Sequence, residues 1–223
     1  MKKSAKKIIY FEGPGPENTD GVLEAIKERL ISSEIKSVVV ASESGNTALK
    51  AAEMLKELDV KVICVMAYGG YQEALGREWP AVSEAIRRKL EGYGVEIIEK
   101  TPWIFGCTFD YWISNKNSPS GQIHKFLSRL FGFGVKTCVE IALIACEAGA
   151  VSSDEEIICI VGTGWLGGGA DAAIVVKPCH IYEGDFLKID KGIEVREIIA
   201  MPRIKFDQKL IEKMKKDGLQ EAI

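Results

Sequence analysis

The amino-acid sequence predicts an α/β domain built around a mainly parallel β-sheet. Short apolar runs rich in Val and Ile alternate with amphipathic helical patterns along the 223 residues, which is typical of βαβ units. Runs such as "KSVVVA" lack polar–apolar alternation, which indicates strands buried on both faces. No repeat, low-complexity tract or linker interrupts the pattern, so we expect a single domain over residues 1–223.

The first half of the chain supplies four of these strands and the helices between them. Strands are expected at 6–11, 36–41, 60–67 and 95–100. A capping signal at Asn18 or Thr19 precedes the helix "VLEAIKERLISS". The second helix is "TALKAAEMLKEL", and the third, "AVSEAIRRKLEGYG", ends in a glycine C-cap.

The second half begins with a long, aromatic-rich segment, 101–120, that we expect to be irregular. Two helical patterns follow, "QIHKFLSRLF" and "VKTCVEIALIACEAG", and then a strand at 156–162. The glycine-rich turn "TGWLGGGAD" is short, so the next strand, 172–178, should run antiparallel. The tail "GIEVREIIAMP" predicts a further strand, and "FDQKLIEKMKKDG" predicts a final charged helix.

Composition excludes several classes of partner. The net charge is −3 and the isoelectric point about 5.6, which leaves no basic footprint for nucleic acid or an acidic membrane. The basic start "MKKSAKKIIYF" is not followed by a long apolar segment, and "IALIAC" is too short to span a bilayer. Six cysteines without a C-x-x-C and only two histidines argue against a metal site. We therefore expect a cytoplasmic protein with buried, reduced thiols.

The loops that leave the carboxyl ends of the parallel strands are the expected ligand site, because open α/β sheets bind ligands there. They are residues 42–47, 68–71, 101–109 and 162–169, and three of the four are rich in Gly, Ser or Thr. A helix that begins at Gly45 or Asn46 would direct free N–H groups at this edge, which suits a phosphate. The candidate binding residues are Ser42, Ser44, Gly45, Asn46, Thr47, Tyr68, Gly69, Gly70, Gly162, Thr163, Gly164, Gly168, Gly169 and Lys136. Plain helix capping is the alternative for 42–47, and Glu43 opposes an anion unless its side chain points away.

Other motifs are less specific. "GTGWLGG" contains G-x-G-x-x-G, but the next segment is a predicted strand rather than a helix, so a Rossmann site is not expected. Lys136 and Glu140 are spaced i, i+4 and form either a structural ion pair or an anion contact. Cys179 and His180 are adjacent in an extended segment, so their side chains point apart and form no dyad. The aromatic residues of 101–112 either cover the core or form a stacking wall for a planar ring.

The sequence also resembles a known family. "VVVASESGNTALKAAEML" resembles the strand–E-S-G-x-T-A–helix segment of the pyruvate kinase C-terminal domain. The whole chain is similar to stand-alone pyruvate kinase C-terminal-like (α/β domain) proteins, through "PGPENT" (14–19), "SESGNTA" (42–48), "LFGFGVKTCVEI" (130–141) and "GGGADAAIVVKP" (167–178). The resemblance implies a three-layer α/β/α fold whose mixed sheet has one antiparallel strand. It also implies a phosphate loop at 42–47 and flavin mononucleotide (FMN) as the ligand.

The resemblance has limits that shape the functional hypotheses. The catalytic barrel of pyruvate kinase is absent, so no phosphoryl transfer from phosphoenolpyruvate is expected. Trp165 and Leu166 stand where relatives often carry a basic residue, which weakens the expected anion contact from that loop. The first hypothesis is a binder of a phosphorylated small molecule, with FMN as the expected ligand, and no catalytic residue is predicted. The second is a regulatory module for a sugar-phosphate or nucleotide effector, acting through a partner or a homo-oligomer. The third is an enzyme on a phosphorylated small molecule, with Glu43, Lys136 or Glu140 as acid–base groups.

Overall fold

A seven-stranded β-sheet forms the centre of the protein in a computed structural model that describes residues 3–106 and 108–217. The spatial order is β1-β7-β6-β5-β2-β3-β4. The strands are β1 (Ile9–Phe11), β2 (Ser37–Ala41), β3 (Lys61–Val65), β4 (Glu96–Ile98), β5 (Ile157–Val161), β6 (Ala172–Lys177) and β7 (Glu194–Pro202). Every pairing is parallel except those of β6, which runs antiparallel to both β5 and β7. The mostly parallel sheet and its antiparallel strand at 172–178 are confirmed.

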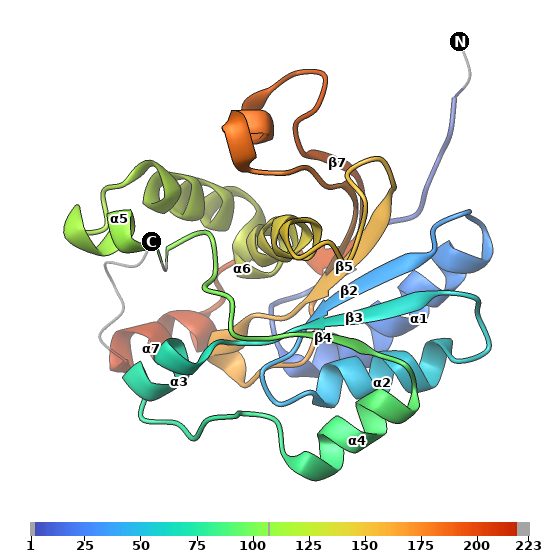
Figure 1. The fold of residues 1–223 in the computed structure, drawn as a ribbon, viewed down its shortest axis with the longest axis horizontal. Coiled ribbons are helices and arrows are strands. Elements are labelled where there is room, and N and C mark those ends of the chain that lie inside the picture. The colour runs from blue at the N-terminus through green and yellow to red at the C-terminus, as the bar shows by residue number, and fades with distance from the viewer. Residues whose placement is uncertain (1–2, 107, 218–223) are drawn as a thin grey trace.

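Helices cover both faces of the sheet (Figure 1). Helices α1 (Thr19–Ile31), α2 (Asn46–Leu55) and α4 (Glu84–Gly92) lie on one side, and α6 (Pro119–Glu147) lies on the other. Smaller elements stand at the periphery: α3 (Gly69–Ala74), α5 (Phe109–Ile113), α7 (Gln208–Lys216) and the 3-10 turns η1 (Pro16–Asn18), η2 (Gly164–Leu166) and η3 (Tyr182–Leu187). The chain is therefore arranged as helix, sheet and helix layers.

Each face of the sheet packs its own hydrophobic core. Along β2, Val38 and Val40 belong to the core under α1 and α2, whereas Val39 belongs to the core under α6. All three side chains are fully buried. Successive strand residues point to opposite faces, so a strand covered on both sides must be apolar throughout, which explains the uninterrupted "VVV".

One prediction for the middle of the chain is confirmed and another is wrong in detail. The two helical patterns after residue 120 are two helices, which meet at a kink at Gly132 (φ 85°, ψ 165°) and together carry the label α6. From Phe133 to Cys146 every residue of α6 is buried, whereas most residues before the kink are at least partly exposed. The segment 101–120 was expected to be irregular, but it contains α5 and the first residues of α6.

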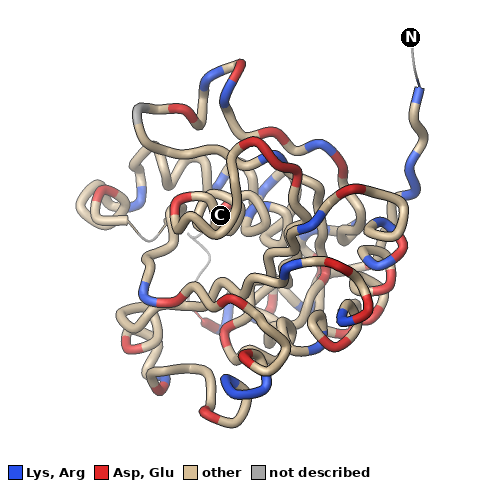
Figure 2. The backbone as a smooth tube through the Cα atoms, turned by 45° about the vertical axis from the view of Figure 1, so that its right-hand side comes forward, with Lys and Arg blue, Asp and Glu red and all other residues tan. Residues whose placement is uncertain are grey.

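The distribution of charged residues and the burial of the cysteines agree with what the sequence indicates. Lys and Arg are interspersed with Asp and Glu over the backbone (Figure 2). Cys64, Cys138, Cys146, Cys159 and Cys179 are free and buried, as expected for thiols in apolar runs, and Cys107 lies outside the described residues. Within the described ranges, none of the helices combines the length and the apolarity that a membrane crossing requires.

Candidate functional site: a cationic groove at the carboxyl edge of the sheet

The parallel strands β2, β3, β4 and β5 bring their carboxyl ends to one edge of the sheet. Strand β6 starts at this edge and ends at the opposite one, because it pairs antiparallel with β5. Cys179 and His180 follow β6 and so lie at the far edge, away from the loops expected to bind a ligand. The sequence-based exclusion of this pair from the site agrees with the topology.

The loop between β2 and α2 begins the helix as predicted. Gly45 is the N-cap of α2, has a left-handed φ of 80° and leaves the helix without a side-chain cap. The first N–H groups of a helix have no intrahelical acceptor, so this terminus suits an external anion. A Cβ on Gly45 would also lie 2.7 Å from Cγ2 of Ile86 on α4. Packing against α4 is therefore sufficient to explain the glycine.

The polar residues around Gly45 divide between surface and interior. Ser44 is exposed, and its Oγ accepts a hydrogen bond of 3.0 Å from Nδ2 of Asn46. Ser42 and Thr47 are buried. Glu43, which opposed an anion site in the sequence, forms a 2.7 Å ion pair with Arg77. Its charge is therefore partly offset.

The expected glycine loop at 68–71 is instead the start of a helix. Tyr68 is the N-cap of α3, and Gly69 and Gly70 form the first turn of that helix. A Cβ on Gly69 would lie 3.5 Å from the ring of Trp79, and one on Gly70 would lie 3.6 Å from the ring of Tyr68. These residues remain at the carboxyl edge, but as a short helical turn rather than an open cradle.

The turn between β5 and β6 is the irregular glycine connection that the sequence predicts. Residues Gly167, Gly168 and Gly169 all have positive φ, at 101°, 88° and 75°. A Cβ on Gly162 would lie 2.5 Å from the carbonyl oxygen of Gly169. The two ends of the turn thus approach each other too closely for side chains, while Gly164 and Gly168 have no neighbour within 4 Å of an added Cβ.

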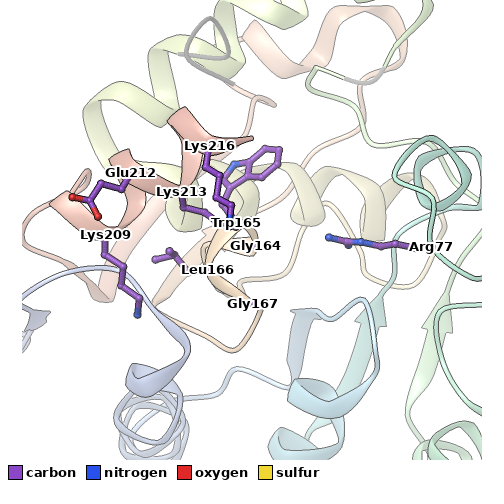
Figure 3. Close-up of a pocket in the computed structure, with 9 residues that line it drawn as sticks. All are labelled: Arg77, Gly164, Trp165, Leu166, Gly167, Lys209, Glu212, Lys213 and Lys216. Atoms are coloured by element: carbon purple, nitrogen blue, oxygen red, sulfur yellow. The ribbon is translucent and has the colours of Figure 1, made fainter. Parts of the chain in front are cut away.

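An open groove of about 740 Å³ lies beside this turn (Figure 3). Its lining comes from the turn, from α7 and from the segment after α3, and consists of Arg77, Gly164, Trp165, Leu166, Gly167, Lys209, Glu212, Lys213 and Lys216. Four of these side chains are cationic and one is a carboxylate. In Figure 3 the lysines extend from α7, and Arg77 reaches toward the turn from the opposite side. The groove is therefore suited to an anion.

The groove cations differ in how far acidic side chains already neutralise them. Arg77 pairs with Glu43, Nζ of Lys209 lies 3.4 Å from Glu17, and Lys213 pairs with Asp217 at 2.8 Å. Lys216 has no ion-pair partner within residues 3–106 and 108–217, and it is exposed. Lys216 is thus the groove cation most available to a ligand.

Sequence reasoning missed the contribution of α7. Its pattern reads as an exposed charged helix, and nothing local places it at the ligand edge. Leu210 and Met214 are buried in a small third core with Phe133, and Trp165 and Leu166 pack against this core. This docking brings the lysines of α7 to the glycine turn. Cationic side chains thus lie beside Trp165 and Leu166, which are apolar.

Lys136 does not line the groove. Its side chain is 5% exposed, and its Nζ lies 3.0 Å from Oε2 of Glu140, whose side chain is fully buried. Oε1 of Glu140 accepts the N–H of Phe105 at 2.5 Å. Burial raises the pKa of Glu140, and the attraction of Lys136 opposes this rise. The structure thus has the ion pair that was one of the two sequence-based interpretations.

Some aromatic residues of 101–112 are buried and others are exposed to solvent. Phe105 is buried, and Trp103 donates its indole N–H to the carbonyl of Met66. Phe109 and Trp112 are 80% and 63% exposed. The segment therefore covers the core at its start and presents aromatic rings to solvent on α5, and it does not form one continuous stacking wall.

Asp171, beside the glycine turn, is another part of this edge that the sequence analysis did not identify. It immediately precedes β6, at the end of the glycine turn, and is fully buried. Its Oδ2 accepts the backbone N–H of Gly15 at 3.1 Å and that of Thr163 at 2.9 Å. Burial raises the pKa of Asp171 to about 6, although the hydrogen bonds from Thr163 and Gly15 oppose this rise.

Two further features of the described residues do not indicate a catalytic pair or a metal site. Sγ of Cys146 lies 3.8 Å and 3.9 Å from the two ring nitrogens of His180. Such equal distances do not aim the thiol at either nitrogen, and burial raises the pKa of Cys146 to about 11. Within the described part of the chain, no group of three or more His, Cys, Asp and Glu side chains is arranged to hold a metal ion.

No protein-family model matches the sequence. The functional assignment therefore depends on the geometry of the carboxyl edge.

Proposed function

We propose that the chain binds a phosphorylated small molecule at the carboxyl edge of its sheet, with FMN as the first candidate. The observation that carries this proposal is the groove itself. Arg77 and three lysines of α7 surround a glycine turn that carries the ring of Trp165. Cationic side chains suit a phosphate, and an aromatic ring suits a planar ligand.

The residues present fit the two halves of FMN. Lys213, Lys216 and Arg77 would hold the phosphate, and Trp165, whose ring packs edge-on to Phe133 with centroids 6.4 Å apart, would contact the isoalloxazine ring. The ion pair of Arg77 with Glu43 connects the groove to the uncapped start of α2. Flavin, when bound, supplies electron-transfer chemistry, and the protein binds, orients and shields it.

The resemblance of residues 42–48 to the pyruvate kinase C-terminal domain supports the same proposal. The three layers and the antiparallel β6 are the arrangement that this family implies. We propose on this basis that the chain is a stand-alone pyruvate kinase C-terminal-like protein. It is not proposed to be an active pyruvate kinase.

Equilibrium titration of FMN, followed by its fluorescence, tests the proposal. The test variant is Lys216→Gln, and the matched control is Lys215→Gln, because Lys215 is an exposed lysine on the same helix that does not line the groove. Loss of one charged phosphate contact should weaken FMN binding about tenfold, and the control should bind as the wild type does. Absence of FMN binding by the wild type, or equal affinities of the two variants, would refute the assignment to this groove.

The alternative is a regulatory module that binds a sugar-phosphate or nucleotide effector without turnover. The observation in its favour is that the groove is open and that Glu212 is the single carboxylate among its lining residues. Glu43 and Glu140, two acid–base candidates of the enzyme hypothesis, do not line the groove, and both are engaged in ion pairs. A thermal-shift panel of FMN, sugar phosphates and nucleotides distinguishes the two, because a ligand of this module should raise the melting temperature when FMN does not.

A further inference from the structure

Asp171 connects two chain segments that are far apart in sequence. Gly15 belongs to the loop between β1 and α1, and Thr163 belongs to the glycine turn after β5. Both donate their backbone N–H groups to the same oxygen, Oδ2 of Asp171. Because the carboxylate is fully buried, water does not compete with these hydrogen bonds, and each contributes more than an exposed one would.

Neighbouring contacts show that the two segments are packed together at this point. The Oγ1 atom of Thr19 accepts the N–H of Ala170 at 2.9 Å. A Cβ on Gly169 would lie 2.6 Å from Cα of Pro16. The β1–α1 loop therefore forms one wall of the glycine turn, and the Asp171 hydrogen bonds lie at the base of that contact.

Both segments lead directly to the groove. Thr163 precedes the 3-10 turn that carries Trp165. Glu17 lies two residues after Gly15, and its carboxylate lies 3.4 Å from Nζ of Lys209 in the groove. A shift of either segment would therefore move an aromatic ring or an ion-paired lysine of the groove.

The second carboxylate oxygen of Asp171 has no hydrogen-bond partner among the described residues. A Cβ on Gly134 of α6 would lie 2.6 Å from this oxygen, Oδ1. A buried oxygen without a donor costs free energy. The arrangement therefore depends on the two hydrogen bonds that Oδ2 accepts.

We propose that Asp171 is a positioning residue, which holds the β1–α1 loop and the glycine turn in register through the two hydrogen bonds that its Oδ2 accepts. This inference rests on the proposed function only in its last step, the effect on ligand binding. The hydrogen bonds from the two N–H donors favour the ionised carboxylate, but burial outweighs them, because the pKa of Asp171 is raised overall. Protonation therefore favours the buried, ordered arrangement, and the ligand edge should loosen as the pH rises through the pKa of Asp171.

The groups that face Asp171 do not reverse this pH dependence. Glu17, from the β1–α1 loop, raises the pKa of Asp171, as burial does. Cys138 faces it from α6, and the pKa of that thiol is raised well above 9, so it stays neutral. From the glycine turn the neighbouring group is Thr163, which does not titrate. The midpoint should thus lie near the value of about 6 that burial sets.

A pH titration of amide signals by ¹H–¹⁵N NMR tests the positioning role in the ligand-free protein. The amide protons of Gly15 and Thr163 should shift together between pH 4.5 and 8 with one midpoint near 6. The isosteric variant Asp171→Asn can still accept both N–H groups but cannot ionise, so it should fold and lose this shared titration. Different midpoints for the two amides, or an unchanged titration in Asp171→Asn, would overturn the proposal.

The variant Asp171→Ala provides a second measurement that does not depend on pH. It removes both acceptors, so hydrogen exchange at the amides of Gly15 and Thr163 should become at least about tenfold faster than in the wild type. Asp171→Asn should restore most of the protection. Equal exchange in the wild type and Asp171→Ala would show that the carboxylate does not hold these segments.

The ligand step is tested with FMN at pH 7.5 and pH 5.5. The phosphate of FMN itself titrates near pH 6, so the quantity compared is the ratio of the two affinities in the wild type and in Asp171→Asn. The affinity at pH 7.5 divided by the affinity at pH 5.5 is expected to be smaller in the wild type than in Asp171→Asn, and equal ratios would refute the coupling of Asp171 to the groove. If the wild type binds no FMN at either pH, the proposed ligand fails, and the NMR and exchange measurements decide the positioning role by themselves.

Discussion

Replacement of Lys136 by Met distinguishes a structural ion pair from a ligand contact. Met has nearly the same length and removes the charge, so Glu140 keeps only the N–H of Phe105 as a donor in a site where its side chain is fully buried. Breaking a buried pair from one side costs about 3–5 kcal/mol, against a total stability of about 5–15 kcal/mol for a typical domain. We expect Lys136→Met to be folded but markedly less stable.

The pH dependence provides an internal check on this loss. The pKa of Glu140 is raised by burial even in the presence of Lys136, and it should rise further in the variant. A carboxyl group with a raised folded-state pKa stabilises the fold below its unfolded value of 4.5, and this contribution is lost as the pH rises through the folded value. The stability of Lys136→Met should therefore fall between pH 5.5 and pH 8 by up to about 1.4 kcal/mol per pH unit.

Urea denaturation at both pH values measures these effects. The double variant Lys136→Met/Glu140→Gln removes the buried charge altogether and should recover most of the lost stability. A cost below about 1 kcal/mol for the single variant, or no recovery in the double variant, would refute the assignment of Lys136 to a structural pair. Loss of FMN binding with unchanged stability would instead show that Lys136 contacts the ligand.

Three further predictions concern the glycine turn and α7. Gly162→Ala should destabilise the fold by about 1–3 kcal/mol in urea denaturation, because its Cβ would lie 2.5 Å from the carbonyl oxygen of Gly169; wild-type stability would contradict the close approach. Gly164→Ala should leave stability almost unchanged and weaken FMN binding, since an added Cβ meets no atom within 4 Å and points into space beside the groove; unchanged FMN affinity would show that the ligand does not reach Gly164. Asp207→Ala removes the side-chain cap of α7, a 2.8 Å bond from the N–H of Leu210, and should cost about 1 kcal/mol and speed hydrogen exchange across α7; wild-type exchange there would show that the cap does not anchor the helix.

The sequence predicts the sheet well because its strands are local signals. The apolar run of β2 identifies a strand with two buried faces, and both cores are indeed packed against it. The antiparallel direction of β6 follows from the shortness of the turn at 163–170, since a parallel connection needs a crossover of a dozen or more residues. Both inferences use residues that are close together in the chain.

The parts of the site that were missed depend on contacts between distant residues. Gly15 and Asp171 are 156 positions apart, and no periodicity or spacing connects them. The lysines of α7 have the pattern of an exposed helix, and their role depends on the small core that Leu210 shares with Phe133 of α6.

The glycines of the candidate site are not equal indicators of a ligand. Gly45 packs against α4, Gly162 faces the opposite end of its own turn, and Gly169 touches Pro16, so each is required by the fold. Gly167 and Gly168 face open space but have positive φ, which favours glycine whether or not a ligand is present. Gly164 has neither a close neighbour nor a positive φ, and it lines the groove. Its backbone is therefore open to close approach by a ligand, which directs the search for the bound molecule to the face of the turn beside Trp165.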